Sequence, residues 1–121
     1  MQYDVIIIGA GPGGIFSAYE LSKLCPDKKI GVFEEGQPLE KRRCPIDGKT
    51  VKHCIGCPTC AIMNGFGGAG AFSDGKYNLT NDFGGTLYEY IGKKQAMELM
   101  HYVDEINVSH GGRSGTSSSS G

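Results

Sequence analysis

The fold is decided by the stretch DVIIIGAGPGG at residues 4–14. Its apolar part, Val5–Ile8, is short and β-branched, which predicts a strand buried on both faces of a parallel sheet. The glycines end that strand, and apolar residues then recur at helical spacing over residues 12–24, which predicts an amphipathic helix. Residues 28–34 alternate and predict a second strand. Residues 3–36 are therefore expected to form one βαβ unit.

The glycines after the first strand follow the Gly-x-Gly-x-x-Gly spacing of dinucleotide-binding turns. Gly9 permits the tight turn, Gly11 lets the backbone approach a pyrophosphate, and Gly14 lets the helix pack on the strand. The N–H groups at the start of the helix favour an anion, so the turn needs no Lys or Arg. Glu34 ends the second strand and would accept hydrogen bonds from ribose hydroxyls, while its charge disfavours the 2′-phosphate of NADP. The alternative is a structural glycine turn with a solvated acid.

These residues, together with IGVFEEG at residues 30–36, resemble the opening of the flavoproteins that bind FAD through a Rossmann-like domain. The segment GFGGAGAFSDGK at residues 65–76, which follows a cysteine-rich loop, is similar to a group of bacterial FAD-dependent dehydrogenases, often described as NAD(FAD)-utilising. The resemblance covers residues 2–110 and implies an α/β fold, a partial Rossmann-like FAD/NAD(P)-binding domain. It also implies that the turn and the end of the second strand contact FAD through Gly9, Gly11, Pro12, Gly13, Gly14, Glu34 and Glu35.

The glycine-rich segment 65–75 exposes backbone N–H groups that can form an anion-binding concavity. Donors of this kind stabilise the negative charge that a reduced flavin develops near N1 and O2. A flexible linker is the alternative, but aromatic side chains in and beside the segment argue against it. The candidates for cofactor contact are Gly67, Gly68, Ala69 and Ser73.

The cysteines follow the spacing Cys54-x-x-Cys57-x-x-Cys60, with Cys44 upstream. A loop with this spacing can wrap several thiolates around one metal centre, either an iron–sulfur cluster or a tetrahedral zinc ion. A redox-active pair that exchanges electrons with flavin is a second interpretation. Structural thiols are the third, and the sequence leaves all three open.

Charge and hydropathy exclude some classes of partner. The chain has 12 Lys and Arg against 13 Asp and Glu, for a net charge of −1. Its longest basic cluster is residues 41–43, which we interpret as a solvated turn, so neither nucleic acid nor a membrane is an expected partner. The sequence lacks the roughly 20 apolar residues of a spanning helix and a basic leader, which predicts a cytoplasmic protein.

The chain is expected to hold one incomplete FAD-binding domain over residues 1–110. Its parts are the βαβ unit, a Cys- and Gly-rich site loop at 37–85 and helices at 86–110 with a weak point at Gly92. Residues 111–121 are predicted to be a disordered Gly/Ser tail.

The predicted function is that of an amino-terminal fragment of a flavin-dependent oxidoreductase, inactive alone. Intact, it would transfer hydride or electrons through FAD to or from a small-molecule substrate or a nicotinamide nucleotide, with NAD as donor or acceptor. The alternatives are an NAD-binding dehydrogenase domain and a small Cys-rich metal-binding or redox module.

Overall fold

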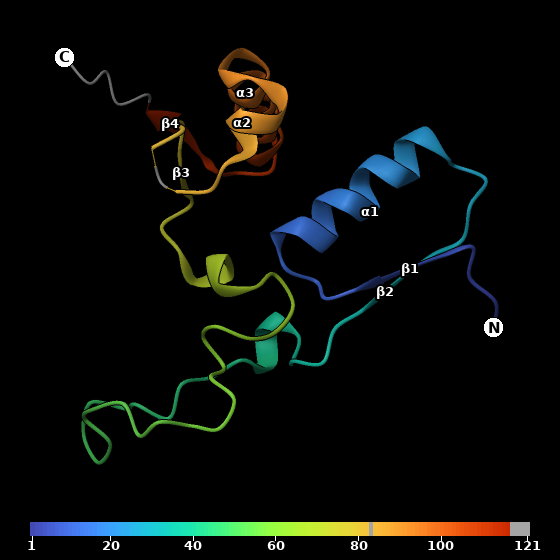
Figure 1. Cartoon of the computed structure of the whole chain (residues 1–121). Coiled ribbons are helices and arrows are strands. Elements are labelled where there is room, and N and C mark those ends of the chain that lie inside the picture. The colour runs from blue at the N-terminus through green and yellow to red at the C-terminus, as the bar shows by residue number, and fades with distance from the viewer. Residues whose placement is uncertain (83, 117–121) are drawn as a thin grey trace. The chain divides into compact units, whose positions relative to one another are not determined.

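The computed structural model describes residues 1–82 and 84–116 (Figure 1). It divides into two compact units, Met1–Ser73 and Asp74–Gly121. The sequence predicts a single incomplete domain over residues 1–110, so the division after Ser73 differs from that prediction. Each unit is described by itself below.

The first unit begins with strand β1 (Val5–Ile8), helix α1 (Pro12–Leu24) and strand β2 (Ile30–Phe33). The two strands pair in parallel, with Val5 opposite Ile30 and Ile8 opposite Phe33. Helix α1 lies alongside both strands (Figure 1). The predicted strand, helix and strand are thus confirmed. The larger Rossmann-like domain stays a prediction, because the described residues form two sheets of two strands each.

The predicted burial of β1 on both faces is wrong. Side chains alternate along the strand, so that Val5 and Ile7 are half-buried while Ile6 and Ile8 are 56% and 82% exposed. Ile7 points toward α1, since a Cβ placed on Gly14 would lie 3.3 Å from its Cγ2 atom. A strand covered by a helix on one face buries only every second residue. Ile6 and Ile8 lie on the other face of the sheet.

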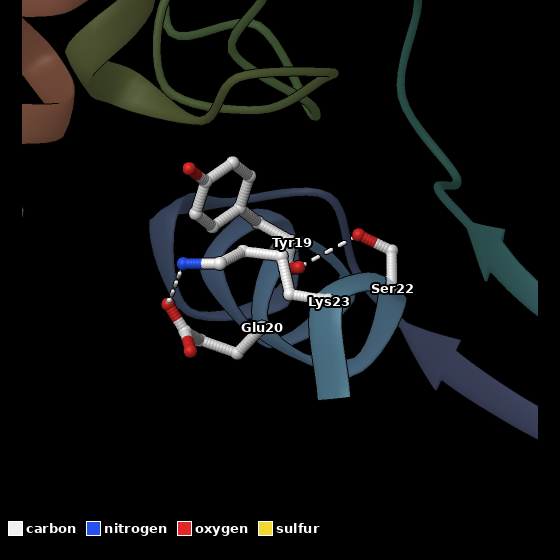
Figure 2. A network of polar contacts seen from close by, with 4 residues as sticks. All are labelled: Tyr19, Glu20, Ser22 and Lys23. Atoms are coloured by element: carbon white, nitrogen blue, oxygen red, sulfur yellow. Dashed lines mark hydrogen bonds and ion pairs between the residues drawn. The ribbon is translucent and has the colours of Figure 1, made fainter. Parts of the chain in front are cut away.

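Helix α1 places its two ends in different chemical surroundings. Proline occupies the first helical position, where its missing N–H costs no hydrogen bond. At the other end, Ser22 Oγ donates to the Tyr19 carbonyl at 2.7 Å, and Lys23 Nζ lies 4.0 Å from Glu20 Oε1 (Figure 2). Exposed pairs of this kind add little stability. The N–H groups without a partner inside the helix are those of its first turn, after the N-cap Gly11.

The second unit contains β3 (Lys76–Asn78), α2 (Leu87–Ile91), α3 (Lys93–Ser109) and β4 (Arg113–Thr116). The predicted weak point is confirmed, because Gly92 separates the two helices with φ of 83°. Strand β4 pairs in parallel with β3. The structure thus has a strand where the sequence predicts the start of a disordered tail, and residues 117–121 lie outside the described part. Within that part, no helix is both long and apolar enough to cross a membrane.

Candidate functional site

Glu34 joins the end of β2 to the turn that follows β1. The Ala10 N–H donates to Glu34 Oε2 at 2.8 Å, and the Gly36 N–H donates to Oε1 at 2.8 Å. One residue earlier on each strand, the Gly9 N–H donates to the Phe33 carbonyl at 2.7 Å. Both carboxylate oxygens are therefore fixed at the sheet edge where β1 ends. Each oxygen keeps a second lone pair that can accept another hydrogen bond.

The same two N–H groups set the charge of this carboxylate. The hydrogen bond from Ala10, then the one from Gly36, lowers the pKa of Glu34 below its ordinary value. The positive charge of Arg42 acts in the same direction, while partial desolvation opposes it. Hydrogen bonds to the ionised form favour that form. Glu34 is therefore an anion at neutral pH, suited to accept hydrogen bonds from the hydroxyl groups of a ligand.

The glycines of the turn have separable roles. Gly9 has φ of 95°, a conformation that side chains disfavour. A Cβ on Gly14 would overlap the carbonyl oxygen of Gly9, whereas one on Gly11 or Gly13 would meet no atom within 4 Å. The fold itself therefore requires Gly9 and Gly14. Gly11 faces open space, which fits its predicted role of leaving room for a ligand.

The amino terminus of α1 opens at this turn. Gly11 is the N-cap and has no side-chain capping hydrogen bond. The Ile15 N–H donates to the Gly11 carbonyl at 2.9 Å and so begins the helical hydrogen-bond series. The N–H groups of Gly13 and Gly14 come before it and have no carbonyl partner in the helix itself. Together with the helix dipole, these donors favour an anion.

The glycine-rich segment lies against the turn. The Gly67 N–H donates to the Ala10 carbonyl at 2.8 Å, and a Cβ on Gly68 would lie 3.2 Å from Pro12 Cδ. Gly68 has φ of 64°, so the chain can turn there without strain. The structure thus brings two of the predicted cofactor-contacting residues, Gly67 and Gly68, to the predicted turn. The predicted exposure of their N–H groups is wrong, because the Gly68 N–H donates to the Gly65 carbonyl at 2.9 Å and that of Gly67 is held by Ala10.

The structure places the other predicted cofactor contacts, Ala69, Ser73 and Glu35, outside the turn. Ala69 begins the 3-10 helix η2 (Ala69–Phe72), and Ser73 follows its end. Glu35 accepts a hydrogen bond from Asn64 Nδ2 at 3.2 Å, so it joins β2 to the loop. Contact of these three residues with a cofactor stays a prediction.

Arg42 is the residue that the sequence analysis missed. The predicted solvated turn is wrong at this position: Lys41 and Arg43 are exposed, but Arg42 is only 4% exposed. Its guanidinium lies 4.8 Å from the centroid of the Phe72 ring. It also donates hydrogen bonds of 2.6–2.9 Å to the carbonyls of Ala61, Ile62, Phe66 and Gly68. No pattern in the sequence separates Arg42 from its basic neighbours, because its partners are main-chain atoms.

The four predicted metal ligands line one cavity of about 240 Å³: Cys44, Cys54, Cys57 and Cys60. They and Cys25 are free thiols. In the described part of the chain, no group of three or more His, Cys, Asp and Glu side chains is arranged to hold a metal ion. The structure therefore gathers these cysteines around one space, and the metal itself stays a prediction.

Comparison with known proteins adds little. No protein-family model matches the chain, and no solved structure matches it. A stretch of 42 residues is 43% identical to an uncharacterized protein of Acanthamoeba polyphaga mimivirus. The match covers 35% of this chain and 8% of the viral protein. Since that protein is itself uncharacterized, the likeness assigns no activity to this chain, and the resemblance to FAD-dependent dehydrogenases stays a prediction.

The chemistry of the site follows from its own groups. The turn and the start of α1 offer main-chain N–H donors, and Glu34 offers a fixed anionic acceptor beside them. The first suits a phosphate and the second suits a pair of hydroxyl groups. The arrangement is thus suited to a ligand that carries both, as a nucleoside diphosphate does.

Proposed function

We propose that this chain binds FAD at the Gly9–Gly14 turn and forms part of a flavin-dependent oxidoreductase. The observation that carries the proposal is the 2.8 Å hydrogen bond between the Ala10 N–H and Glu34 Oε2. It holds the strand-end carboxylate next to the amino terminus of α1. A ribose and a diphosphate that are joined in one ligand need these two groups side by side.

The two parts of the ligand would bind to different groups of the site. The diphosphate would be held by the N–H groups at the start of α1, where Gly11 leaves space for it. The adenosine ribose would be held by Glu34, which is already ionised and keeps acceptor capacity on both oxygens. The same negative charge would repel a 2′-phosphate, so NADP is disfavoured.

The glycine-rich segment borders the proposed FAD site. Gly67 and Gly68 lie against the turn, where their own N–H groups donate to the carbonyls of Ala10 and Gly65. When bound, FAD would supply hydride or electron-pair transfer. The resemblance to FAD-dependent dehydrogenases favours the same assignment, with Ala69 and Ser73 as further contacts.

The expected partners follow from this assignment. They are a small-molecule substrate or a nicotinamide nucleotide, with NAD as electron donor or acceptor, and neither nucleic acid nor a membrane. We expect a cytoplasmic protein, in line with its free cysteines.

Replacing Gly11 with alanine tests the proposal. The added methyl group meets no protein atom within 4 Å, so the fold should be unchanged. It would occupy the space of the diphosphate, and we expect the affinity for FAD and ADP to fall at least tenfold, or about 1.4 kcal/mol. Isothermal titration calorimetry of both ligands measures this, and circular dichroism checks the fold.

The matched control is Ser22→Ala, at the opposite end of the same helix, which should bind both ligands like the unchanged chain. Binding of NADP as tight as that of FAD would contradict the proposal. So would full affinity of the Gly11→Ala variant for both ligands.

A further inference from the structure

Two sets of hydrogen bonds, one on each side of Cys44 in the sequence, fold the loop that carries the cysteines. The first is a turn at Asp47. The N–H groups of Asp47 and Gly48 donate to the Val51 carbonyl at 3.1 and 3.2 Å, and Asp47 Oδ1 accepts from the Val51 N–H at 2.8 Å. Cys44 comes three residues before this turn and Cys54 three residues after it. The two cysteines therefore lie on the two arms of one turn.

The second set of hydrogen bonds comes from the Arg42 side chain. Its Nε and Nη2 atoms donate to the carbonyls of Ala61 and Ile62 at 2.8 and 2.6 Å. Arg42 lies two residues before Cys44, and Ala61 directly follows Cys60. These bonds bring the two ends of the cysteine loop together, so Cys60 is held in the region of Cys44.

The cysteines share one cavity. All four cysteines line its volume of about 240 Å³, and Ile46 and Ile55 contribute apolar surface. Thiolates that bind one zinc ion lie about 2.3 Å from a common point. Among the described residues, no group of three or more His, Cys, Asp and Glu side chains is arranged to hold a metal ion, so the thiols would have to move together on binding either kind of centre. A cubane iron–sulfur cluster attaches its four thiolates to four separate iron atoms, so it needs ligands that surround a larger space.

The sequence and charge of the loop agree with a cluster. In bacterial two-cluster ferredoxins a cluster is held by a Cys-x-x-Cys-x-x-Cys run and by the Cys-Pro that ends the other run, four residues after its third cysteine. This chain differs in having Asn64 at that place and its Cys-Pro before the run. Here the run is Cys54, Cys57 and Cys60, and the separate Cys-Pro is Cys44-Pro45. Residues 41–60 contain five Lys and Arg and one acid, Asp47, whose carboxylate is engaged in the turn. A cluster bound by four thiolates is an anion, which this charge balance favours.

We propose that Cys44, Cys54, Cys57 and Cys60 ligate a [4Fe–4S] cluster in this cavity. The site is separate from the dinucleotide turn, and the proposal goes beyond the proposed flavin binding. Either one can fail without the other.

The test is anaerobic reconstitution of the full chain with equal amounts of ferrous and ferric iron and with sulfide, followed by removal of unbound iron. We expect about four iron atoms and about four acid-labile sulfides per chain, with visible charge-transfer absorption that bleaches on reduction by dithionite. Serine in place of Cys54 or Cys57 should abolish that absorption. Cys25→Ser is the matched control, since Cys25 lies outside the cavity, and it should retain full iron and absorption. Circular dichroism of each variant checks that α1 remains folded.

Three results would overturn the proposal. The first is stoichiometric binding of one zinc ion with no cluster under reconstitution. The second is formation of disulfides between these cysteines on mild oxidation, together with no iron bound to the chain after anaerobic reconstitution. The third is equal iron in the unchanged chain and in a variant that lacks all four cysteines. ADP titration of the cluster-free chain then tests the dinucleotide turn independently.

Discussion

Replacing Arg42 with methionine is expected to destabilise the first unit by about 3 kcal/mol, because it removes a buried charged donor from several carbonyls at once. Methionine can fill much of the space but cannot donate a hydrogen bond. The carbonyls of Ala61, Ile62, Phe66 and Gly68 would lose their partner. The glycine-rich segment should then detach from the turn after β1.

Urea unfolding followed by circular dichroism measures the loss of stability, and limited proteolysis shows where the chain opens. We expect new cleavage within residues 37–73. Arg43→Met is the matched control, because Arg43 is the exposed neighbour and should change stability little. Arg42→Lys should fall between the two, since an ammonium group cannot span the same set of carbonyls. Equal stability of the Arg42→Met and Arg43→Met variants would contradict the role given to Arg42.

Replacing Gly14 with alanine is expected to have the second large effect, a loss of about 3 kcal/mol. The new methyl group would overlap the Gly9 carbonyl oxygen, a main-chain atom that cannot move aside without shifting β1 or α1. Thermal unfolding of the variant should show a clear fall in Tm.

Gly13→Ala is the control for this prediction, because it lies one residue away in the same helical turn. Its methyl group would meet no atom within 4 Å. Alanine is a better helix former than glycine, so this variant should keep or gain up to about 1 kcal/mol of stability. Similar stability changes in the two variants would show that the close approach at Gly14 does not govern the packing of α1.

The sequence predicts the first 36 residues well because their signals are local. A β-branched run, a glycine turn and a helical repeat specify β1 and α1 without reference to the rest of the chain. The position of Glu34 at the end of β2 also follows from counting residues. The burial of β1 could not be predicted, because it depends on how many faces of the sheet are covered. Ile6 and Ile8 are β-branched and apolar, as residues of a buried strand usually are, and are nevertheless exposed.

The sequence does not predict the parts of the fold and the site that depend on contacts between residues far apart in the chain. Arg42 looks like its exposed neighbours, and only the fold of the loop places its guanidinium among carbonyls. Strand β4 is not predicted for a related reason: its residues, Arg-Ser-Gly-Thr, carry no apolar alternation, and it forms by pairing with β3. By contrast, the run of glycines at 65–75 predicts cofactor contact at Gly67 and Gly68 through exposed N–H groups, but the N–H groups of both residues donate to carbonyls of the chain. The structure places both against the turn.

The central claim is that a dinucleotide binds where β1 passes into α1, and amide chemical-shift mapping tests it most directly. The 15N-labelled chain is titrated with ADP, and the shift of each N–H group is followed. We predict the largest changes in chemical shift at Gly11, Gly13, Gly14 and Ile15. A further change is expected at Ala10, whose N–H donates to Glu34, when that carboxylate accepts hydrogen bonds from the ribose hydroxyls. Saturating ADP that leaves these five amides unmoved, or that moves amides of α3 instead, would contradict the account.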